Sequence, residues 1–307
     1  MTMEYFRPNT KEELVDLLKV KNENTYFAAG CTDLMIHFHE KKIYNYNLID
    51  LTQIRDSRDI DLTKDAIIIG AFVTAARLEE SPVIKSYIPA LARAAGMLGS
   101  TQIRNLATIG GNLGNASQSA DLIPVLAACG AVIILLNSKG KLIEYSIDEL
   151  ITGSGLTSLK QDEVIWSIRI PRSSRFSAFD KVGARKSVTI SKINGCLSAE
   201  ILDGRIKNPV IYLGAVGRKA LRAPFVEAAI DGKRLEDYQD IHYGEASGKH
   251  TVYPSEQLKA AVEEQIEANI PDRPSKHYKK KAAFGMMLNM IEELKVQNRQ
   301  KIAAGET

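Results

Sequence analysis

The sequence predicts an α+β protein, and three observations lead to this fold class. A short unit of strand, loop, helix and strand occupies residues 25–51, and apolar runs alternate with capped helices over residues 66–171. Beyond residue 175, strand follows strand before helices close the chain. The 307 residues, 45% of them hydrophobic, suffice to bury the cores of two or three domains.

The first unit begins with a helix that carries its own start signal. Thr10 followed by Glu13 forms a capping box, and leucines then recur at helical spacing. The pattern predicts a helix at 11–19, a strand in TYFAAG at 25–30, a helix at 33–42 and a strand at 47–51.

The next region opens with AIIIGAFVT from Ala66, which is typical of a buried strand. Thr74, Ser81 and the neighbourhood of Pro89 each predict a helix start, and Asp121 is expected to cap a helix over Leu122–Cys129. Strands are predicted at 131–136, 141–145 and 163–171.

A polar, basic segment at 172–175 marks a domain boundary. After it, the pattern predicts a three-stranded antiparallel sheet with a tight Asp203-Gly204 turn, backed by helices. The strands are expected at 176–184, 193–206 and 209–217, the helices at 223–229, 256–268 and 276–296, and a flexible tail at 297–307.

The most informative stretch is TIGGNLGNASQSAD, from Thr108 to Asp121. Two adjacent glycines and a dense set of Asn, Ser and Thr residues lead directly into a helix. Glycine lets a backbone approach a ligand closely, and short polar side chains suit phosphate oxygens. The alternative is a tight strand-to-helix turn, but the number of polar groups favours ligand binding.

A second small-residue turn lies upstream in FAAGCTDL, at Phe27 to Leu34. Taken alone, it could be a helix entry capped by Thr32 or Asp33. Paired with the first stretch, it suggests one dinucleotide with a central pyrophosphate. Neither stretch matches a P-loop or the GxGxxG fingerprint, so Rossmann-type binding is not expected.

Several other features have ordinary structural explanations. Cys31 is interpreted as a small packed side chain because no basic residue adjoins it. Lys181 could pair with an anionic ligand group or stay solvated. His37 and His39 are expected on a helix rather than on a metal, and the lysines of KHYKKK at 276–281 form a solvated or partner-facing surface. Three scattered cysteines without a CxxC pair argue against a cluster or zinc site in this chain.

Charge and hydropathy limit the classes of partner. The net charge is only +3 and no apolar run is long enough to span a bilayer, so nucleic acid and membrane are disfavoured. The N-terminus has no basic segment followed by an apolar core. We therefore expect a cytoplasmic protein.

Both stretches resemble the flavin-binding signatures of the FAD subunit of molybdenum hydroxylases, the xanthine and carbon monoxide dehydrogenase group. The resemblance extends to FRPNTKEELVDLL at 6–18, LIDLTQI at 48–54, STQIRNLATIGGN at 100–112 and FSAFDKVGARKSVTISKINGCLSAEI at 176–201. It implies an FAD-binding domain of the vanillyl-alcohol oxidase type over residues 1–175, with subdomains at about 1–55 and 56–175. A smaller α+β domain at 176–296 follows.

The resemblance also implies the site. The expected FAD-binding residues are Phe27, Ala28, Ala29, Gly30, Cys31, Thr32, Asp33, Leu34, Thr108, Ile109, Gly110, Gly111, Asn112, Asn115, Ser117, Asp121, Ile165 and Lys181. Cys31, Gly114 and Gln118 depart from the common pattern. No residue of this chain is nominated as catalytic, and no metal ligand is expected.

By resemblance, the chain is the FAD-containing electron-transfer subunit of a hetero-oligomer, with a dimer of heterotrimers as one arrangement. A molybdenum-cofactor subunit would oxidise the substrate, and a two-cluster iron-sulfur subunit would deliver electrons to the FAD. NAD is the preferred acceptor, with a quinone, oxygen or ferredoxin as alternatives. Two other readings stay open, namely a self-sufficient flavin oxidase and a non-catalytic nucleotide-binding protein.

Overall fold

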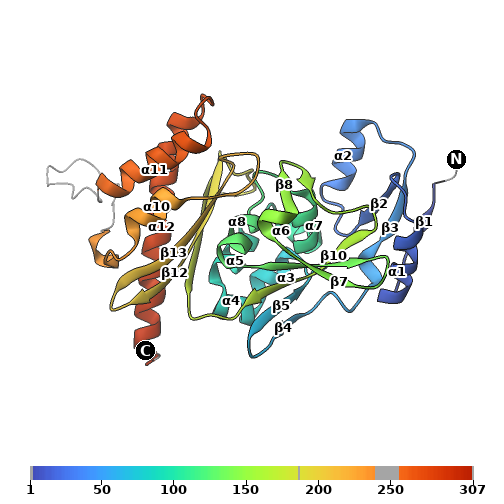
Figure 1. Cartoon of the computed structure of the whole chain (residues 1–307), viewed down its shortest axis with the longest axis horizontal. Coiled ribbons are helices and arrows are strands. Elements are labelled where there is room, and N and C mark those ends of the chain that lie inside the picture. Colours follow the sequence, from blue (N-terminus) through green and yellow to red (C-terminus); the bar gives the residue numbers. More distant parts are fainter. Residues whose placement is uncertain (1–2, 186, 239–255, 306–307) are drawn as a thin grey trace.

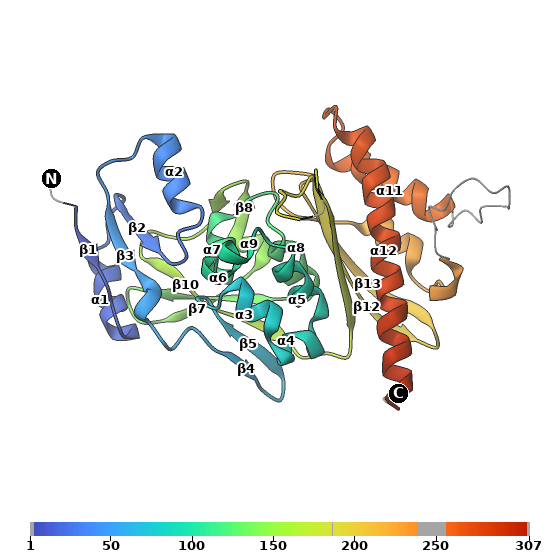
Figure 2. The same ribbon diagram turned by 180° about the vertical axis from the view of Figure 1, so that it is seen from behind.

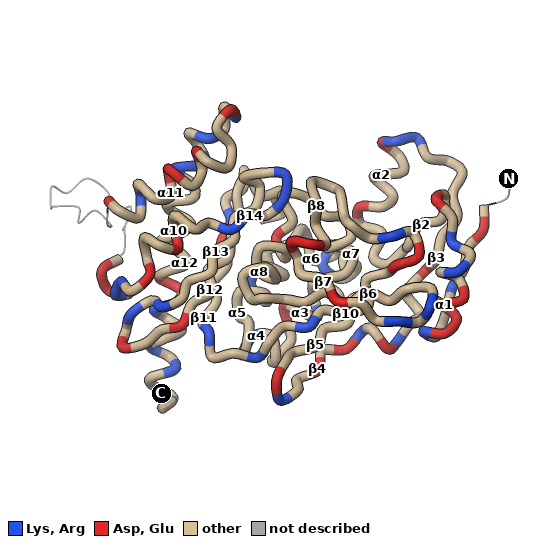
Figure 3. Tube along the Cα trace, in the orientation of Figure 1, with Lys and Arg blue, Asp and Glu red and all other residues tan. Residues whose placement is uncertain are grey.

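The computed structural model describes residues 3–185, 187–238 and 256–305. Three sheets lie in a row along the molecule, with the N-terminal unit at one end and the C-terminal helices at the other (Figure 1). The two ends are joined through a central helical layer. Lys, Arg, Asp and Glu are distributed along all three parts (Figure 3).

The N-terminal sheet is parallel, with strand order β1-β3-β2. Its elements are β1 (Tyr5–Phe6), α1 (Lys11–Val20), β2 (Thr25–Ala28), α2 (Leu34–Lys41), β3 (Asn47–Asp50) and η1 (Leu51–Gln53). Thr10 caps α1 by accepting from the Glu13 amide, but the Glu13 carboxylate bonds the amide of Asn9 instead of closing the predicted box.

The central sheet has the order β4-β5-β10-β6-β7, antiparallel throughout. Its strands are β4 (Ile60–Leu62), β5 (Ala66–Gly70), β6 (Val132–Asn137), β7 (Leu142–Ser146) and β10 (Glu163–Pro171). One face is covered by α3 (Ala75–Glu80), α4 (Pro82–Tyr87), α5 (Pro89–Gly96), α6 (Thr101–Leu106), α7 (Ile109–Asn115) and α8 (Leu122–Ala128). Figure 2 shows this helical layer from behind. The short α9 (Ile147–Leu150) leads into the hairpin of β8 (Ile151–Gly153) and β9 (Leu156–Thr157).

The C-terminal sheet has four strands rather than the predicted three. The order is β11 (Phe176–Val182), β12 (Ile193–Leu202), β13 (Arg205–Gly214) and β14 (Leu221–Arg222). The fourth strand has two residues and so lacks the alternation by which strands are recognised. It pairs with Tyr212 and Leu213 at the edge of β13.

The helices of this domain are α10 (Pro224–Ile230), η2 (Leu235–Asp237), α11 (Glu256–Asn269) and α12 (Lys276–Ala303). The predicted flexible tail at 297–307 is wrong as far as Ala303, because α12 continues through it. Gln297 donates to the Ser177 carbonyl at 2.9 Å and the Lys301 ammonium lies 5.4 Å from the Phe176 ring centroid, so this end of α12 is anchored on β11.

Two apolar cores share the C-terminal sheet. Phe179 and Cys196 point from one face into the larger core of the first 170 residues, while Ala178 and Leu197 point from the other face toward α10, α11 and α12. Within the described residues, no helix combines the length and apolar character needed to cross a lipid bilayer.

Candidate functional site

The turn between β2 and α2 lies at the carboxyl end of the parallel N-terminal sheet. This is the edge where open parallel sheets commonly bind ligands. Cys31 has a left-handed backbone, with φ of 55°. Gly30 is required by a close backbone approach, since a Cβ there would lie 2.0 Å from the Leu106 carbonyl oxygen.

The backbone amides from Gly30 to Leu34 have no protein acceptor within the described residues. Consecutive unpaired N–H groups leading into a helix N-terminus form a concave site for an anion. The Asp33 side chain makes no capping bond to these amides, contrary to one of its predicted alternatives. The turn can therefore offer its amides to phosphate oxygens.

The TIGGN segment is a helix start rather than the open loop that its glycines suggested. Thr108 is the N-cap of α7, and its Oγ1 accepts from the Gly111 amide at 3.0 Å. Ile109 is fully buried, and Gly110 packs so closely that a Cβ would lie 2.7 Å from the Ala71 carbonyl oxygen. These two residues belong to the core.

Gly111 and Gly114 lie one turn apart on the exposed side of α7. A Cβ on Gly111 would meet only the Thr108 Oγ1, at 2.9 Å, and one on Gly114 would meet only the Ile165 Cδ1, at 3.9 Å. Neither glycine is needed for close packing within the protein, apart from the cap at Thr108. On this side, α7 therefore exposes its backbone without side chains and can be approached closely by a ligand.

The two stretches meet directly. The Asn115 Nδ2 donates to the Asp33 Oδ1 at 3.2 Å, across 82 positions of sequence, and Gly30 contacts the chain just before Ala107. Nearby, the Asn112 Oδ1 is buried without a donor among the described residues. A buried amide oxygen without a partner is unfavourable, and so points to a donor supplied from outside the chain.

The end of the second stretch is held by the C-terminal domain. Asp121 was expected to cap α8 but makes no capping bond. Its Oδ2 accepts from the Lys181 Nζ at 2.6 Å, and its Oδ1 accepts from Ser191 at 2.6 Å and Asn194 at 2.7 Å. Asp121 and Lys181 are therefore brought together as a buried ion pair that joins the domains.

The remaining predicted residues lie beside the β2–α2 turn, α7 and the segment that ends at Asp121. Ile165 is buried on β10 at a β-bulge, an irregularity that commonly re-aims side chains beside binding sites. Ser117 bonds the amide of Ser119, and Thr32 bonds the carboxylate of Asp33. Phe27, Ala28, Ala29 and Leu34 line the strand end and the first turn of α2.

A polar group behind the first turn was missed from the sequence. Tyr5 and Arg7 both contact Asp50, at the end of β3. Burial alone would raise the pKa of Asp50, but hydrogen bonds from Tyr5 and Thr52 and the Arg7 charge outweigh it and lower that pKa. The only available signal was an aspartate at a predicted strand end.

The Asp50 carboxylate also affects the pKa of the Cys31 thiol. Burial, followed by the nearby Asp50 carboxylate, raises the pKa of its thiol. A higher thiol pKa leaves less thiolate, which is the reactive form. Cys31 is therefore suited to packing beneath the turn, as interpreted from the sequence, and not to nucleophilic chemistry.

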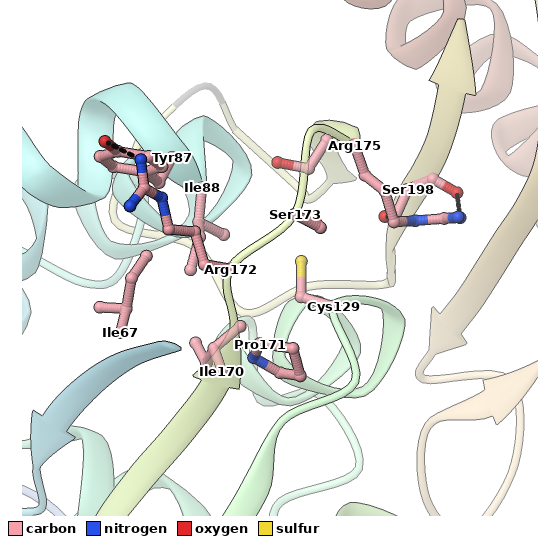
Figure 4. Close-up of a pocket in the computed structure, with 11 residues that line it drawn as sticks. Ile67, Tyr87, Ile88, Cys129, Ile170, Pro171, Arg172, Ser173, Arg175 and Ser198 are labelled. Carbon is pink, nitrogen blue, oxygen red and sulfur yellow. Dashed lines mark hydrogen bonds between the residues drawn. The ribbon is translucent and has the colours of Figure 1, made fainter. Parts of the chain in front are cut away.

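A small pocket lies elsewhere, at the junction of the domains (Figure 4). Its volume of about 20 Å³ leaves space for a water-sized molecule only. Among the described residues, no three His, Cys, Asp or Glu side chains come together as metal ligands. His37 and His39 lie exposed on α2.

Residues 1–173 match the family described as the FAD binding domain in molybdopterin dehydrogenase. The chain belongs to this family. It is therefore an oxidoreductase flavoprotein with an FAD-binding domain, as the resemblance in its sequence implied.

Relatives of known activity cover most of the chain. The nicotinate dehydrogenase FAD-subunit of Eubacterium barkeri is 31% identical over 76% of this chain and 80% of its own length. The xanthine dehydrogenase FAD-binding subunit of Escherichia coli O157:H7 is 27% identical over 73% and 77%. Among solved structures, carbon monoxide dehydrogenase from Hydrogenophaga pseudoflava superposes with a TM-score of 0.81 at 25% identity, covering 95% of this chain and 96% of that one.

Proposed function

We propose that this chain is the FAD-containing electron-transfer subunit of a molybdenum hydroxylase complex. Its FAD diphosphate lies between the β2–α2 turn and α7. The observation that carries the proposal is the convergence of unpaired amides from Gly30 to Leu34 with the bare glycine face of α7. The hydrogen bond between Asn115 and Asp33 fixes their spacing.

The residues present fit such a group. A diphosphate needs donors and close backbone approach, which the turn and Gly111 supply. The buried Asn112 Oδ1 accepts one hydrogen bond from a ligand hydroxyl or amide. Ile165, beneath Gly114, offers an apolar surface at the same helix.

Asp121 and Lys181 can contact FAD only if they give up or share hydrogen bonds that they already make. Both carboxylate oxygens of Asp121 are already bonded, and the Lys181 ammonium also donates to the Met97 carbonyl at 2.7 Å. A contact with FAD requires each of them to share or exchange a present bond. Their main contribution in the described structure is to hold the Ser117–Asp121 segment against the C-terminal domain.

Bound FAD would supply the ability to take up single electrons and give them up as a pair. The residues of the two stretches would hold and orient that group, and we nominate none of the described residues as catalytic. We propose that electrons arrive from an iron-sulfur partner subunit, that a molybdenum-cofactor subunit oxidises the substrate, and that NAD is the acceptor. The description of the matching family as part of molybdopterin dehydrogenase, and the names of two relatives as separate FAD subunits, support the presence of partner subunits. Cytoplasmic location and a dimer of heterotrimers remain part of the proposal.

Purification of the tagged chain from its native host tests the function. We expect a yellow protein that co-purifies with two further subunits, one containing molybdenum. NADH should bleach the isolated chain under anaerobic conditions if NAD is the acceptor. Direct bleaching by an organic substrate in the isolated chain would favour a self-sufficient oxidase. A colourless chain that takes up no added FAD would favour a non-catalytic protein.

A further inference from the structure

Ser57 lies in the segment that connects the two halves of the FAD-binding domain. This segment, residues 54–59, runs from η1, which follows the N-terminal parallel sheet, to β4 at the edge of the central sheet. The first half carries the β2–α2 turn and the second half carries α7 (Figure 1). The placement of the connecting segment therefore bears on how the two parts of the proposed diphosphate site are spaced.

The Ser57 hydroxyl is buried and bonded to the central sheet. The residue is 1% exposed. Its Oγ donates to the Trp166 carbonyl of β10 and accepts from the Ala71 amide, just beyond β5, at 2.9 Å. The Ser57 carbonyl accepts from the Phe72 amide, also at 2.9 Å. Three hydrogen bonds thus fix this point of the connecting segment to β10 and to the residues that follow β5.

A glycine in β5 allows the segment to come this close. A Cβ on Gly70, the last residue of β5, would lie 2.2 Å from the Ser57 carbonyl carbon. The Gly70 amide also donates to the Asp59 carbonyl at 2.9 Å. A larger residue at this position would push the connecting segment away from the sheet, so the close approach of Ser57 depends on a glycine here.

The hydrogen bonds continue from Ser57 into α7. The Ala71 amide donates to the Ser57 Oγ, and the Ala71 carbonyl accepts from the Gly110 amide at 2.8 Å. Gly110 lies in the first turn of α7, next to Gly111 at the proposed diphosphate. Because Ala71 is fully buried and bonded through both its amide and its carbonyl, a shift at Ser57 would be transmitted to the start of α7.

The other partner of the hydroxyl lies at the β-bulge of β10. The register of β10 against β6 shifts after Ile165, so Trp166 is the extra residue of the bulge. Its carbonyl accepts from both the Ser57 hydroxyl and the Ala71 amide, which holds the irregular backbone in place. Ile165, the preceding residue, supplies the apolar surface beside Gly114.

We propose that Ser57 is a positioning residue for FAD, whose hydroxyl holds the connecting segment, the bulge of β10 and the start of α7 in the arrangement that fits the cofactor. The inference rests on the proposed function, since it concerns the same FAD site. Ser57 acts through Ala71 and Trp166, not by touching the cofactor. Without the hydroxyl, the Ala71 amide still bonds the Trp166 carbonyl at 2.9 Å, so the sheet stays formed while the connecting segment loosens.

Matched serine variants test this proposal. Ser57→Ala should raise the dissociation constant for FAD about three- to tenfold, the factor that corresponds to one lost hydrogen bond. It should also change the visible circular dichroism of the bound flavin. Ser177→Ala is the control, because it too removes a buried hydroxyl, one that accepts from the Ala90 amide at 3.4 Å beside the C-terminal domain. This control should leave both flavin measurements unchanged, and an unchanged dissociation constant in Ser57→Ala would overturn the proposal.

Hydrogen exchange on the wild-type chain gives a second test, which does not depend on how well a variant folds. If the Ser57 anchor strengthens FAD binding, bound FAD must strengthen the anchor by the same free energy. Added FAD should therefore slow amide exchange in peptides that cover residues 54–59, and unchanged exchange there would overturn the role of Ser57. Wild-type chain that takes up no FAD would instead contradict the proposed function itself.

Discussion

At the scale of single residues, neighbouring glycines of the TIGGN segment have different tasks. Gly110 faces inward, where a Cβ would lie 2.7 Å from the Ala71 carbonyl oxygen and 2.8 Å from the Ala71 Cβ. Gly111 faces outward and contacts only its own cap. One glycine is therefore required by the fold and the other by the proposed ligand.

This difference predicts opposite effects of two substitutions. Gly111→Val should weaken FAD binding by about tenfold or more, or about 1.4 kcal/mol, because its side chain occupies the ligand face. Its Tm should stay close to that of the parent. Gly110→Ala should instead lower the free energy of unfolding by about 1–3 kcal/mol through overpacking. Equilibrium dialysis with FAD and thermal unfolding measure the two effects, and unchanged flavin retention in Gly111→Val would contradict the placement.

At the scale of elements, the sequence predicts helix starts correctly where the N-cap contacts only its own helix. Thr74 and Ser81 cap α3 and α4 as predicted, because an N-cap needs only the next three residues. The predicted N-cap at Asp121 is wrong, because Lys181, Ser191 and Asn194 of the C-terminal domain donate to its carboxylate instead of the amides of α8. The sequence prediction also failed for α7, whose three glycines disfavour a helix that the Thr108 cap and the contacts with Val73 and Ala71 nevertheless impose.

Long-range parts of the site were visible only through resemblance. Nothing local predicts that Asn115 meets Asp33 or that Gly30 packs on Leu106, because these contacts depend on how two sheets are placed. The charge run at 276–281 was likewise ambiguous. Lys276 and Lys280 bond Glu267, and Lys279 is buried and donates to the Ala215 carbonyl, so much of the run holds the domain together.

The buried pair that joins the two domains predicts a large and asymmetric effect. The Lys181 and Asp121 side chains are 3% and 8% exposed, so Lys181→Met leaves a buried carboxylate without its counter-ion. We expect a loss of about 3–5 kcal/mol in the free energy of unfolding. Lys19→Met, in the exposed pair with Asp16, should cost about 0–1 kcal/mol. Adding Asp121→Asn to Lys181→Met should recover part of the loss in urea unfolding, and equal costs for the two lysine variants would contradict this view.

The hairpin of α11 and α12 predicts a pH dependence. Hydrogen bonds from Lys276, then Lys280, lower the pKa of Glu267 to about 2 from a usual value of 4.5. Folding therefore favours the ionised carboxyl, and its stabilisation is present above pH 4.5 and is lost as pH falls toward 2. Because this carboxylate is 44% exposed, salt should weaken the effect.

The matched pair for this test lies on one helix. Glu267→Gln should lower the Tm at neutral pH, and the difference from the parent should shrink as the pH falls through 4.5 toward 2. Glu264→Gln, at an exposed position of α11, should change the Tm little at any pH. A Glu267→Gln difference that is the same at neutral and acidic pH would show that the two lysines are not its cause.

At the scale of the whole molecule, the two domains share apolar packing rather than meeting at a polar boundary. Phe179, Cys196 and Ala220 of the C-terminal domain lie in the same core as α5, α8 and the central sheet. The opposite face of that C-terminal sheet carries the second core, beneath α10, α11 and α12. The C-terminal β-sheet therefore connects the core of the FAD-binding domain to the core beneath the C-terminal helices.

This shared sheet predicts that the domains unfold together. Trp166, the single tryptophan, lies in β10 of the FAD-binding domain, whereas α12 dominates the helical signal of the C-terminal domain. Tryptophan fluorescence and far-ultraviolet circular dichroism should report one thermal transition. Phe179→Ala, which empties a fully buried site, should cost about 3–5 kcal/mol and lower both signals by the same number of degrees. If the midpoint of the Trp166 fluorescence transition is unchanged in Phe179→Ala while that of the helical signal falls, the domains unfold independently. The contact between Asp33 and Asn115 would then form without help from the C-terminal sheet.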